Sequence, residues 1–249
     1  SENTGTFMLF VMLLVVAVLP MLGLGGMQLY KAETPGPMKD TKFTPRIAET
    51  ARGLWGVYFL FSGACLLGYR WAGMSWADAF MHMCTTMGLG GFSSHDASLG
   101  YFNSPAVEYV AIVFMALSGI SFLRYFVVLR SRSLRPITHD REIRTYAAVL
   151  AAAIVLLAVM LAAHGTYEEF PEALRHSAFH VLSLATTTGY ATTDYAQWPI
   201  FAPVLLIFLG TFVSCAGSTG GGIKMVRMIL LIKQARRELV RIIHRPRPG

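Results

Sequence analysis

The chain alternates long apolar blocks with short polar segments. Five blocks, at residues 6–26, 53–68, 107–123, 146–163 and 200–213, carry almost no charge. Several of them approach the roughly 20 residues that a helix needs to cross a bilayer. A cleaved signal peptide fits the first block poorly, because no basic segment precedes it and no small-residue cleavage site is evident. The pattern therefore predicts an all-α integral membrane protein.

Two further apolar stretches, residues 76–87 and 171–185, are too short to cross a bilayer as helices. Each begins at a helix-start signal, Ser75 before the first and Pro171 in the second. Backbone that ends at mid-membrane depth survives only inside protein or beside water. We therefore expect two re-entrant helices, each followed by a loop that returns to its own side.

The chain also matches itself at an offset of 98 residues without a gap. Each copy contains an apolar helix, a short helix, a Gly-rich break, an acidic stretch and a second apolar helix. The match predicts two units with the same fold, helix–re-entrant pore loop–helix. The aligned pairs include His82 with His180, Gly91 with Gly189, Phe92 with Tyr190, and Asp96 with Asp194.

The segment that follows the second short helix, Thr-Thr-Thr-Gly-Tyr at residues 186–190, suits the coordination of a cation. An extended return path would align backbone carbonyls, which can replace the hydration shell of K⁺. Glycine permits a positive φ, and the C-terminal end of the short helix favours a cation. The first copy, with Gly88, Gly90 and Gly91, allows the same irregular path. Both breaks are therefore candidate strands of a cation filter.

The distribution of charge predicts the orientation. The formal net charge is +7, but with alternating crossings all Lys and Arg except Arg70 and Arg175 fall on one side. By the positive-inside rule that side is cytoplasmic, which also argues against a nucleic-acid partner. The opposite mouth collects acids such as Asp96 and Asp194, which would raise the local cation concentration or, alternatively, cap the loops.

Several motifs together resemble the Trk/Ktr/HKT superfamily of potassium transporters, specifically the pore-forming membrane subunit of the bacterial Trk type. They are the two breaks, GGMQLYKAETPGP at 25–37 and CAGSTGGGIKM at 215–225. In that family each chain carries four pore-loop units of potassium-channel-like architecture around one pore, and each filter has a central glycine. The resemblance implies that K⁺ binds at the filter. The filter residues it implies are Leu89, Gly90, Gly91, Thr187, Thr188 and Gly189, with Gly91 and Gly189 central.

The resemblance further implies that the Gly-rich segment 217–222 is an intramembrane loop that gates the pore beneath the filter. Its glycines independently disfavour a continuous helix, at about 1 kcal/mol each. Close packing between helices is the alternative use of such small residues. The implied gate residues are Gly217, Ser218, Thr219, Gly220, Gly221 and Gly222.

By the same resemblance the chain holds two complete units, at 53–130 and at 145–232, the latter with a broken inner helix. Residues 1–30 match the second helix of an incomplete first unit. Residues 31–52 and 131–144 are predicted cytoplasmic linkers. Residues 233–249 are predicted to be a basic cytoplasmic tail that lies at the membrane surface or docks a cytosolic subunit. A fourth unit is missing, so we expect a partial chain.

We therefore expect potassium uptake across a bacterial cytoplasmic (inner) membrane, through a carbonyl-lined filter with a gate. An ion-coupled secondary transporter of another solute is the alternative, because repeats and broken helices occur there too; a purely structural subunit would show no flux. The resemblance implies a homodimer with a cytosolic nucleotide-binding regulatory subunit, in contact with membrane lipid. We expect no enzyme activity and no organic cofactor, since His95 and Asp96 lack a third ligand or a placed nucleophile.

Overall fold

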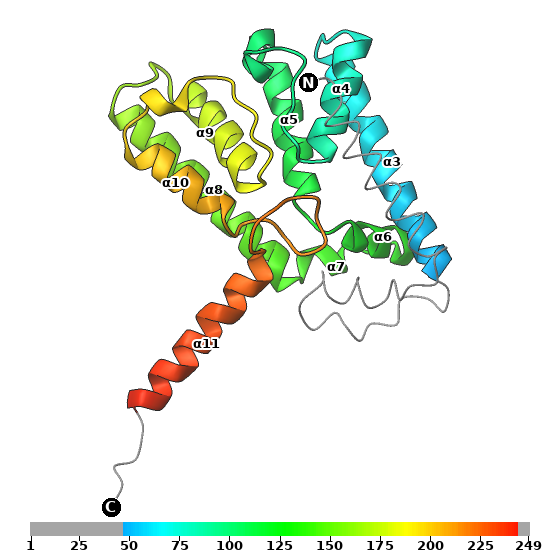
Figure 1. Cartoon of the computed structure of the whole chain (residues 1–249), viewed down its shortest axis with the longest axis vertical. Helices are drawn as coiled ribbons and strands as arrows, with labels where there is room; N and C mark the ends of the chain where they lie inside the picture. The colour runs from blue at the N-terminus through cyan, green and yellow to red at the C-terminus, as the bar shows by residue number, and fades with distance from the viewer. Residues whose placement is uncertain (1–46, 244–249) are drawn as a thin grey trace, which may run out of the picture.

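A computed structural model describes residues 47–243 of the chain, with side chains from 52 to 240. The expected helix at 1–30, most of the linker at 31–52 and the end of the tail lie outside the described residues. Within 47–243 every regular element is a helix (Figure 1). The elements are α3 (Ile47–Trp71), α4 (Trp76–Met87), η2 (Ser98–Phe102), α5 (Pro105–Ser118), α6 (Phe122–Ser131), α7 (Arg135–Thr138), α8 (Arg141–Ala163), α9 (Phe170–Ala185), η3 (Tyr195–Gln197), α10 (Phe201–Gly210) and α11 (Met225–Ile243).

The helices form two similar groups, α3–α4–α5 and α8–α9–α10, which lie side by side in Figure 1. In each group a long helix leads into a short helix, then a loop with a 3₁₀ turn, then another helix. The short helix α4 has the predicted bounds, and α9 begins one residue before Pro171. The Ser75 hydroxyl accepts the Asp78 amide proton at 3.1 Å and so caps α4. The predicted all-α repeat of helix, pore loop and helix is confirmed.

The two groups share one core. Helix α9 packs against α8 and α10 of its own group and against α5 of the other, which joins the two units. Apolar side chains fill the space between the helices, and the large ones that are fully buried come from both groups. They include Tyr69, Met87, Met115, Leu157, Phe179, Tyr190 and Leu206.

The apolar block at 107–123 is not a single helix, contrary to expectation. Helix α5 ends at Ser118, and α6 leaves it at 84°. At the bend, a Cβ on Gly119 would collide with the hydroxyl of Tyr146, and the Gly119 carbonyl accepts the amide proton of Cys215 at 3.1 Å. A distant segment therefore occupies the path along which the helix would continue.

The unit boundaries drawn from the sequence also differ from the helix ends. The boundary at 130 falls within α6. The boundary at 145 falls within α8, which begins at Arg141 because the Asp140 carboxylate caps it, accepting the Glu142 amide proton at 2.7 Å. The boundary at 232 falls within α11, which runs unbroken into the predicted tail. Helix α10 ends at Gly210 and α11 begins at Met225, and the Gly-rich segment 217–222 lies between them.

One helix among the described residues, α8, is by itself long and apolar enough to cross a membrane, and the bent pair α5–α6 passes the same test when counted as one span. Several helices turn large apolar side chains outward. Such surfaces would be unfavourable in water and suit contact with lipid. They include Phe59, Leu60 and Leu67 on α3, Val155, Leu156 and Val159 on α8, and Val204, Ile207 and Phe208 on α10.

An ion pair crosses the boundary between the units. The Arg175 Nε of α9 lies 3.0 Å from the Glu108 Oε2 of α5, and the Glu108 side chain is only 9% exposed. Arg175 has a second acid nearby, Glu172, whereas Arg175 is the one cation that pairs with Glu108 among the described residues. The pair therefore holds α5 and α9 together at the ends where both helices begin.

Arg175→Gln should destabilise the protein, because it leaves the Glu108 carboxylate buried without its cation, at a cost of about 1–3 kcal/mol. The double variant Arg175→Gln with Glu108→Gln should recover part of that loss. Thermal unfolding in detergent measures both. Equal melting temperatures for the single and the double variant would show that the pair does not couple the units.

Candidate ion-coordinating site

The loop after α4 keeps a specific irregular path through local hydrogen bonds. The Leu89 amide donates to the Thr86 carbonyl at 3.2 Å, and the Gly90 amide donates to the Thr85 carbonyl at 2.8 Å. These bonds reverse the chain at once after Met87, where the short helix ends. The break therefore starts at the C-terminal end of the helix, where the helix dipole favours a cation.

The loop after α9 repeats these bonds 98 residues later. The Thr187 amide donates to the Leu184 carbonyl at 3.0 Å, and the Thr188 amide donates to the Ser183 carbonyl at 2.8 Å. Each bond joins the residue that the sequence repeat pairs with its counterpart in the first loop. The repeat found in the sequence is thus a repeat of backbone geometry.

The backbone dihedrals agree in the same way. Leu89 has φ 51° and Thr187 has φ 64°, while the two central glycines, Gly91 and Gly189, have φ 65° and 88°. A side chain with a Cβ costs about 1–2 kcal/mol in this left-handed region, so Leu89 and Thr187 are strained positions. Strain of this kind persists only where the surroundings hold the backbone in place, and it concentrates at functional sites.

The two loops touch at Gly91. A Cβ on Gly91 would lie 2.8 Å from the carbonyl carbon of Thr188 and closer still to its oxygen. Only glycine allows the two backbones to approach this closely. At Gly189, by contrast, a Cβ would have no atom within 4 Å. The structure therefore brings Gly91 into contact with Thr188 and Gly189, and leaves open the side of Gly189 on which a Cβ would stand.

The predicted gate lies directly against the ends of both short helices. The Thr219 hydroxyl donates to the Met87 carbonyl at 3.0 Å, and the Gly221 amide donates to the Thr187 hydroxyl at 2.7 Å. A Cβ on Gly220 would lie 2.9 Å from the Thr186 carbonyl oxygen. In Figure 1 this loop lies between the short helices and the start of α11.

Three further side chains bond the predicted gate loop, and the sequence did not predict these contacts. The Ser214 hydroxyl donates to the Gly221 carbonyl at 2.5 Å, and the Lys224 ammonium donates to the Gly220 carbonyl. The Glu142 carboxylate accepts the Ala216 amide proton at 2.7 Å. Only the acidic first turn of α8 signals Glu142 in the sequence, and nothing there indicates its distant partner.

The two predicted mouth acids have different surroundings. Asp194 caps the turn η3: its carboxylate accepts the Ala196 amide proton and a Gln197 side-chain proton, each at 3.1 Å. Asp96 is exposed. In the part of the chain that the structure describes, no group of three or more His, Cys, Asp or Glu side chains could hold a metal ion. Asp194 therefore has the capping geometry that was the alternative reading.

A different acid holds the first outer loop. The Asp78 carboxylate accepts a proton from the Ser94 hydroxyl at 2.9 Å and lies 3.2 Å from the His95 Nε2. The His95 ring stacks on Tyr101 at 3.6 Å between centroids. These contacts fix the loop that leads away from Gly91. Asp78 lies in the first turn of the short helix, and the sequence around it does not indicate that Ser94 and His95 are its partners.

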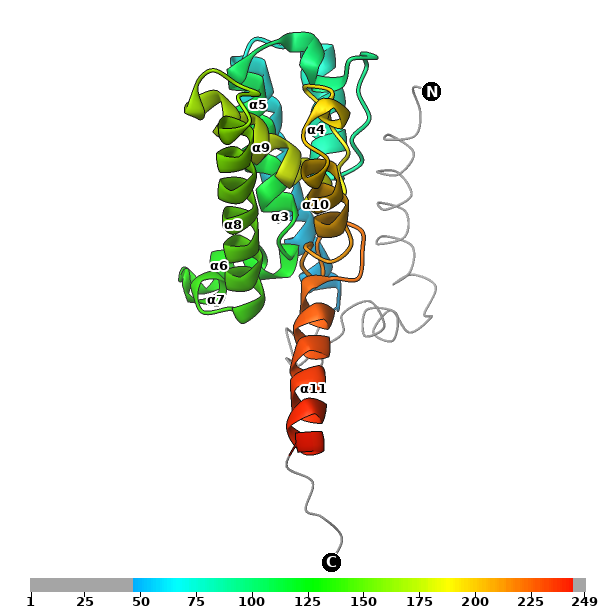
Figure 2. The ribbon, with the colours of Figure 1, turned by 90° about the vertical axis from the view of Figure 1, so that its left-hand side faces the viewer.

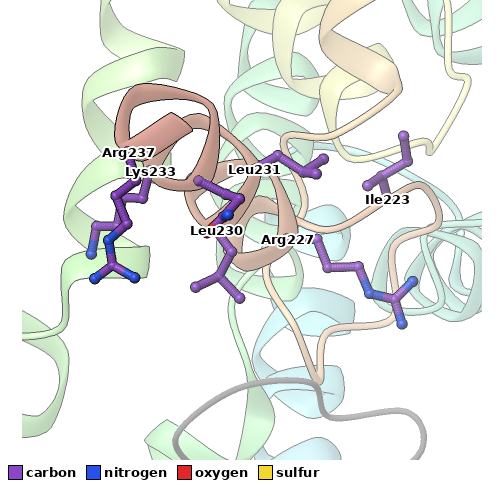
Figure 3. Close-up of a pocket in the computed structure, with 7 residues that line it drawn as sticks. Ile223, Arg227, Leu230, Leu231, Lys233 and Arg237 are labelled. Atoms are coloured by element: carbon purple, nitrogen blue, oxygen red, sulfur yellow. The ribbon is translucent and has the colours of Figure 1, made fainter. Parts of the chain in front are cut away.

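Helix α11 leaves the bundle beside the gate loop and extends beyond it (Figure 2). Near its start an open groove combines apolar and basic side chains (Figure 3). Arg227, Lys233 and Arg237 point away from the body of the helix, as do Leu230 and Leu231. Its residues Lys233 and Arg237 belong to the predicted tail at 233–249, whereas Arg227, Leu230 and Leu231 precede that tail.

Gly91→Ala should destabilise the protein more than Gly165→Ala. Both glycines have almost the same φ, 65° and 66°, but a Cβ at Gly165 has no atom within 4 Å. Both variants carry the left-handed penalty of about 1–2 kcal/mol, and only Gly91→Ala also forces Thr188 away. Thermal unfolding in detergent compares the melting temperatures of the two variants. Equal decreases from the wild-type value would mean that the two loops do not touch at Gly91.

Comparisons with known proteins find close relatives of this chain. Residues 4–246 match the family described as "TrkH: Cation transport protein". The Trk system potassium uptake protein TrkH of Salmonella typhimurium is 46% identical over 234 residues, which make up 94% of this chain and 48% of that protein. The protein of the same name from Halomonas elongata is 47% identical over 235 residues, with the same two coverages.

A solved structure agrees as well. The crystal structure of the potassium transporter TrkH from Vibrio parahaemolyticus has a TM-score of 0.78 to this chain at 38% identity, covering 95% of this chain and 47% of that one. The chain thus spans about half the length of the curated relatives it matches. The resemblance carried by the sequence motifs is confirmed, and the chain belongs to the TrkH family of cation transport proteins.

Proposed function

We propose that this chain contributes two filter segments and a gate to a pore for potassium uptake. The main support is that two repeated loops, each at the C-terminal end of a short helix, share the same strained backbone and meet at Gly91. The relatives named above are potassium uptake proteins. The proposed K⁺ ligands are backbone carbonyls of Leu89, Gly90, Gly91, Thr187, Thr188 and Gly189.

Further filter segments would complete the ring. The open side of Gly189 leaves space where, by analogy with the contact at Gly91, another loop would pack. Phe92, the counterpart of the fully buried Tyr190, is 47% exposed, which leaves a second free side. Both free sides support a ring with more members than the two loops of this chain.

The gate proposal rests on the two hydrogen bonds from Thr219 and Gly221 to the filter region. A loop bonded to the ends of both short helices obstructs any path that runs between them. Opening requires that these bonds break, so their loss should favour the open state. Residues 217–222 are therefore the proposed gate.

The proposed location is the cytoplasmic membrane of a bacterium, with the gate on the inner side. The basic helices α6, α7 and α11 lie at one end of the molecule, and the 3₁₀ turns η2 and η3 lie at the other (Figures 1 and 2). Cytoplasmic segments are enriched in Lys and Arg, which supports this orientation. The basic and apolar surface of α11 supports contact with membrane lipid at that end.

The proposed assembly is a homodimer that works with a cytosolic nucleotide-binding regulatory subunit. The relatives' names describe a Trk system, which supports further components. We infer transport without enzyme activity and without an organic cofactor; K⁺ is the cargo. An ion-coupled secondary transporter is the second candidate, favoured by the broken helix pair α10 and α11. Rubidium uptake into liposomes, with and without an imposed ion gradient, distinguishes the two.

Gly189→Ser in the intact protein should weaken the preference for K⁺ over Na⁺, because serine disfavours the φ of 88° that the filter backbone requires. Gly165→Ser is the matched control, since it imposes a similar strain away from the filter. Competition of Na⁺ with rubidium uptake measures the preference. Unchanged competition in Gly189→Ser, with uptake intact, would exclude Gly189 from the filter.

Thr219→Val should raise flux about two- to tenfold, the effect of losing one hydrogen bond that holds the closed state. Thr211→Val is the control, because the Thr211 hydroxyl bonds the Phe208 carbonyl of α10 rather than the filter region. Initial rates of rubidium uptake in liposomes measure both. Deletion of residues 217–222 should raise flux further. A conducting Thr219→Val protein with the wild-type rate would argue against the gate.

A further inference from the structure

We propose that Tyr190 is a positioning residue for ion selectivity: its hydroxyl ties the second filter segment to the short helix of the first unit. The inference rests on the proposed function, since it concerns the same filter. Tyr190 directly follows Gly189 and is fully buried. Its side chain reaches across the contact between the two loops to helix α4 of the first unit.

The Tyr190 hydroxyl lies within hydrogen-bond distance of three oxygen atoms of α4. They are the Thr85 hydroxyl, the Thr86 hydroxyl at 3.1 Å and the His82 carbonyl at 3.2 Å. A phenol carries one proton, which the carbonyl can accept, and both threonines can then donate to the phenol oxygen. All three contacts are satisfied at once in this arrangement.

The chain of hydrogen bonds continues to α3. The Tyr69 hydroxyl lies 2.7 Å from the Thr86 hydroxyl, and Tyr69 is also fully buried. Tyr69 can donate to Thr86, Thr86 to Tyr190, and Tyr190 to the His82 carbonyl. Hydrogen bonds that run in one direction through an apolar interior strengthen one another. The network therefore holds Tyr190 at a defined distance from two helices of the first unit.

The backbone around Tyr190 is held as firmly as its side chain. The Tyr190 carbonyl accepts a proton from the Ser183 hydroxyl of α9 at 2.6 Å. The next residue, Ala191, donates its amide proton to the Ser98 hydroxyl at 3.3 Å, and its carbonyl accepts the Gly100 amide proton at 3.2 Å. The filter segment is thus fixed between its own short helix and the first unit, so a shift of Tyr190 displaces Gly189.

The network is not a feature of the repeat. The counterpart of Tyr190 is Phe92, which has no hydroxyl and is 47% exposed. The two loops share their backbone, but only the second carries this bond to a neighbouring helix. A general need for aromatic packing would be met by phenylalanine at both positions. The hydroxyl at 190 therefore has a separate role, which we assign to the spacing between the two filter segments.

The test is Tyr190→Phe in the intact protein, reconstituted in liposomes, with the inhibition of rubidium uptake by K⁺ and by Na⁺ as readout. We expect uptake to persist and the preference for K⁺ over Na⁺ to fall about two- to tenfold, the range for one lost hydrogen bond. Tyr125→Phe is the matched control: it removes another buried tyrosine hydroxyl, which bonds the Leu117 carbonyl at 2.8 Å. The preference of Tyr125→Phe for K⁺ over Na⁺ should stay at the wild-type value.

A second pair of variants keeps the inference testable if Tyr190→Phe fails to fold. Thr86→Val should lower the preference as Tyr190→Phe does, and Thr86→Ser, which keeps a hydroxyl, should restore it. Uptake with an unchanged preference in Tyr190→Phe, or equal preferences in the two Thr86 variants, would overturn the inference. Failure of the proposed function gives a different result, because the wild-type protein itself would then take up no rubidium.

Discussion

The structure depends on where its irregular backbone finds hydrogen-bond partners. Three segments leave helical geometry inside an apolar bundle: the loops after α4 and α9, and the break between α10 and α11. Unpaired backbone groups there would cost several kcal/mol each. The three segments solve this together, because Thr219 of the break bonds the end of α4 and Gly221 bonds Thr187. Neither the two proposed filter loops nor the proposed gate loop could keep its present form without the other.

The features that recur in both copies of the repeat and the features that differ between them have separate roles. Backbone bonds and φ values recur at the same offset in both loops, and these are the features that would place carbonyls around an ion. The surroundings of the two loops differ: the backbone of Gly91 meets that of Thr188 while Gly189 has an open side, and Tyr190 is buried while Phe92 is exposed. Each loop faces a different neighbour, so the same backbone needs different side chains around it.

Features with local causes were predictable from the sequence. The short helices follow from their apolar length and start signals, and the break after Gly210 follows from clustered glycines. Contacts between distant segments were not. The bend after Ser118 is held by Tyr146 and by Cys215, which lies nearly a hundred residues away. The sequence around Ser118 indicates neither contact. The proposal that Gly91 and Gly189 belong to a filter rests on the repeat and on the resemblance, whereas the contacts of Glu142 and Tyr190 could be found only in the structure.

The gate loop also has a mechanical connection to the basic end of the molecule. Glu142, in the first turn of α8, accepts the Ala216 amide proton, and the neighbouring Asp140 caps α8 while pairing with Arg124 of α6. The start of α8 thus bonds the proposed gate loop, which contacts both proposed filter loops. A displacement of the start of α8 must either carry that loop along or break the bond to Ala216, and a displacement of α6 reaches α8 through the pair of Arg124 with Asp140. Because both helices lie at the basic end, we infer that a force applied there acts on the proposed gate loop before it reaches the proposed filter loops.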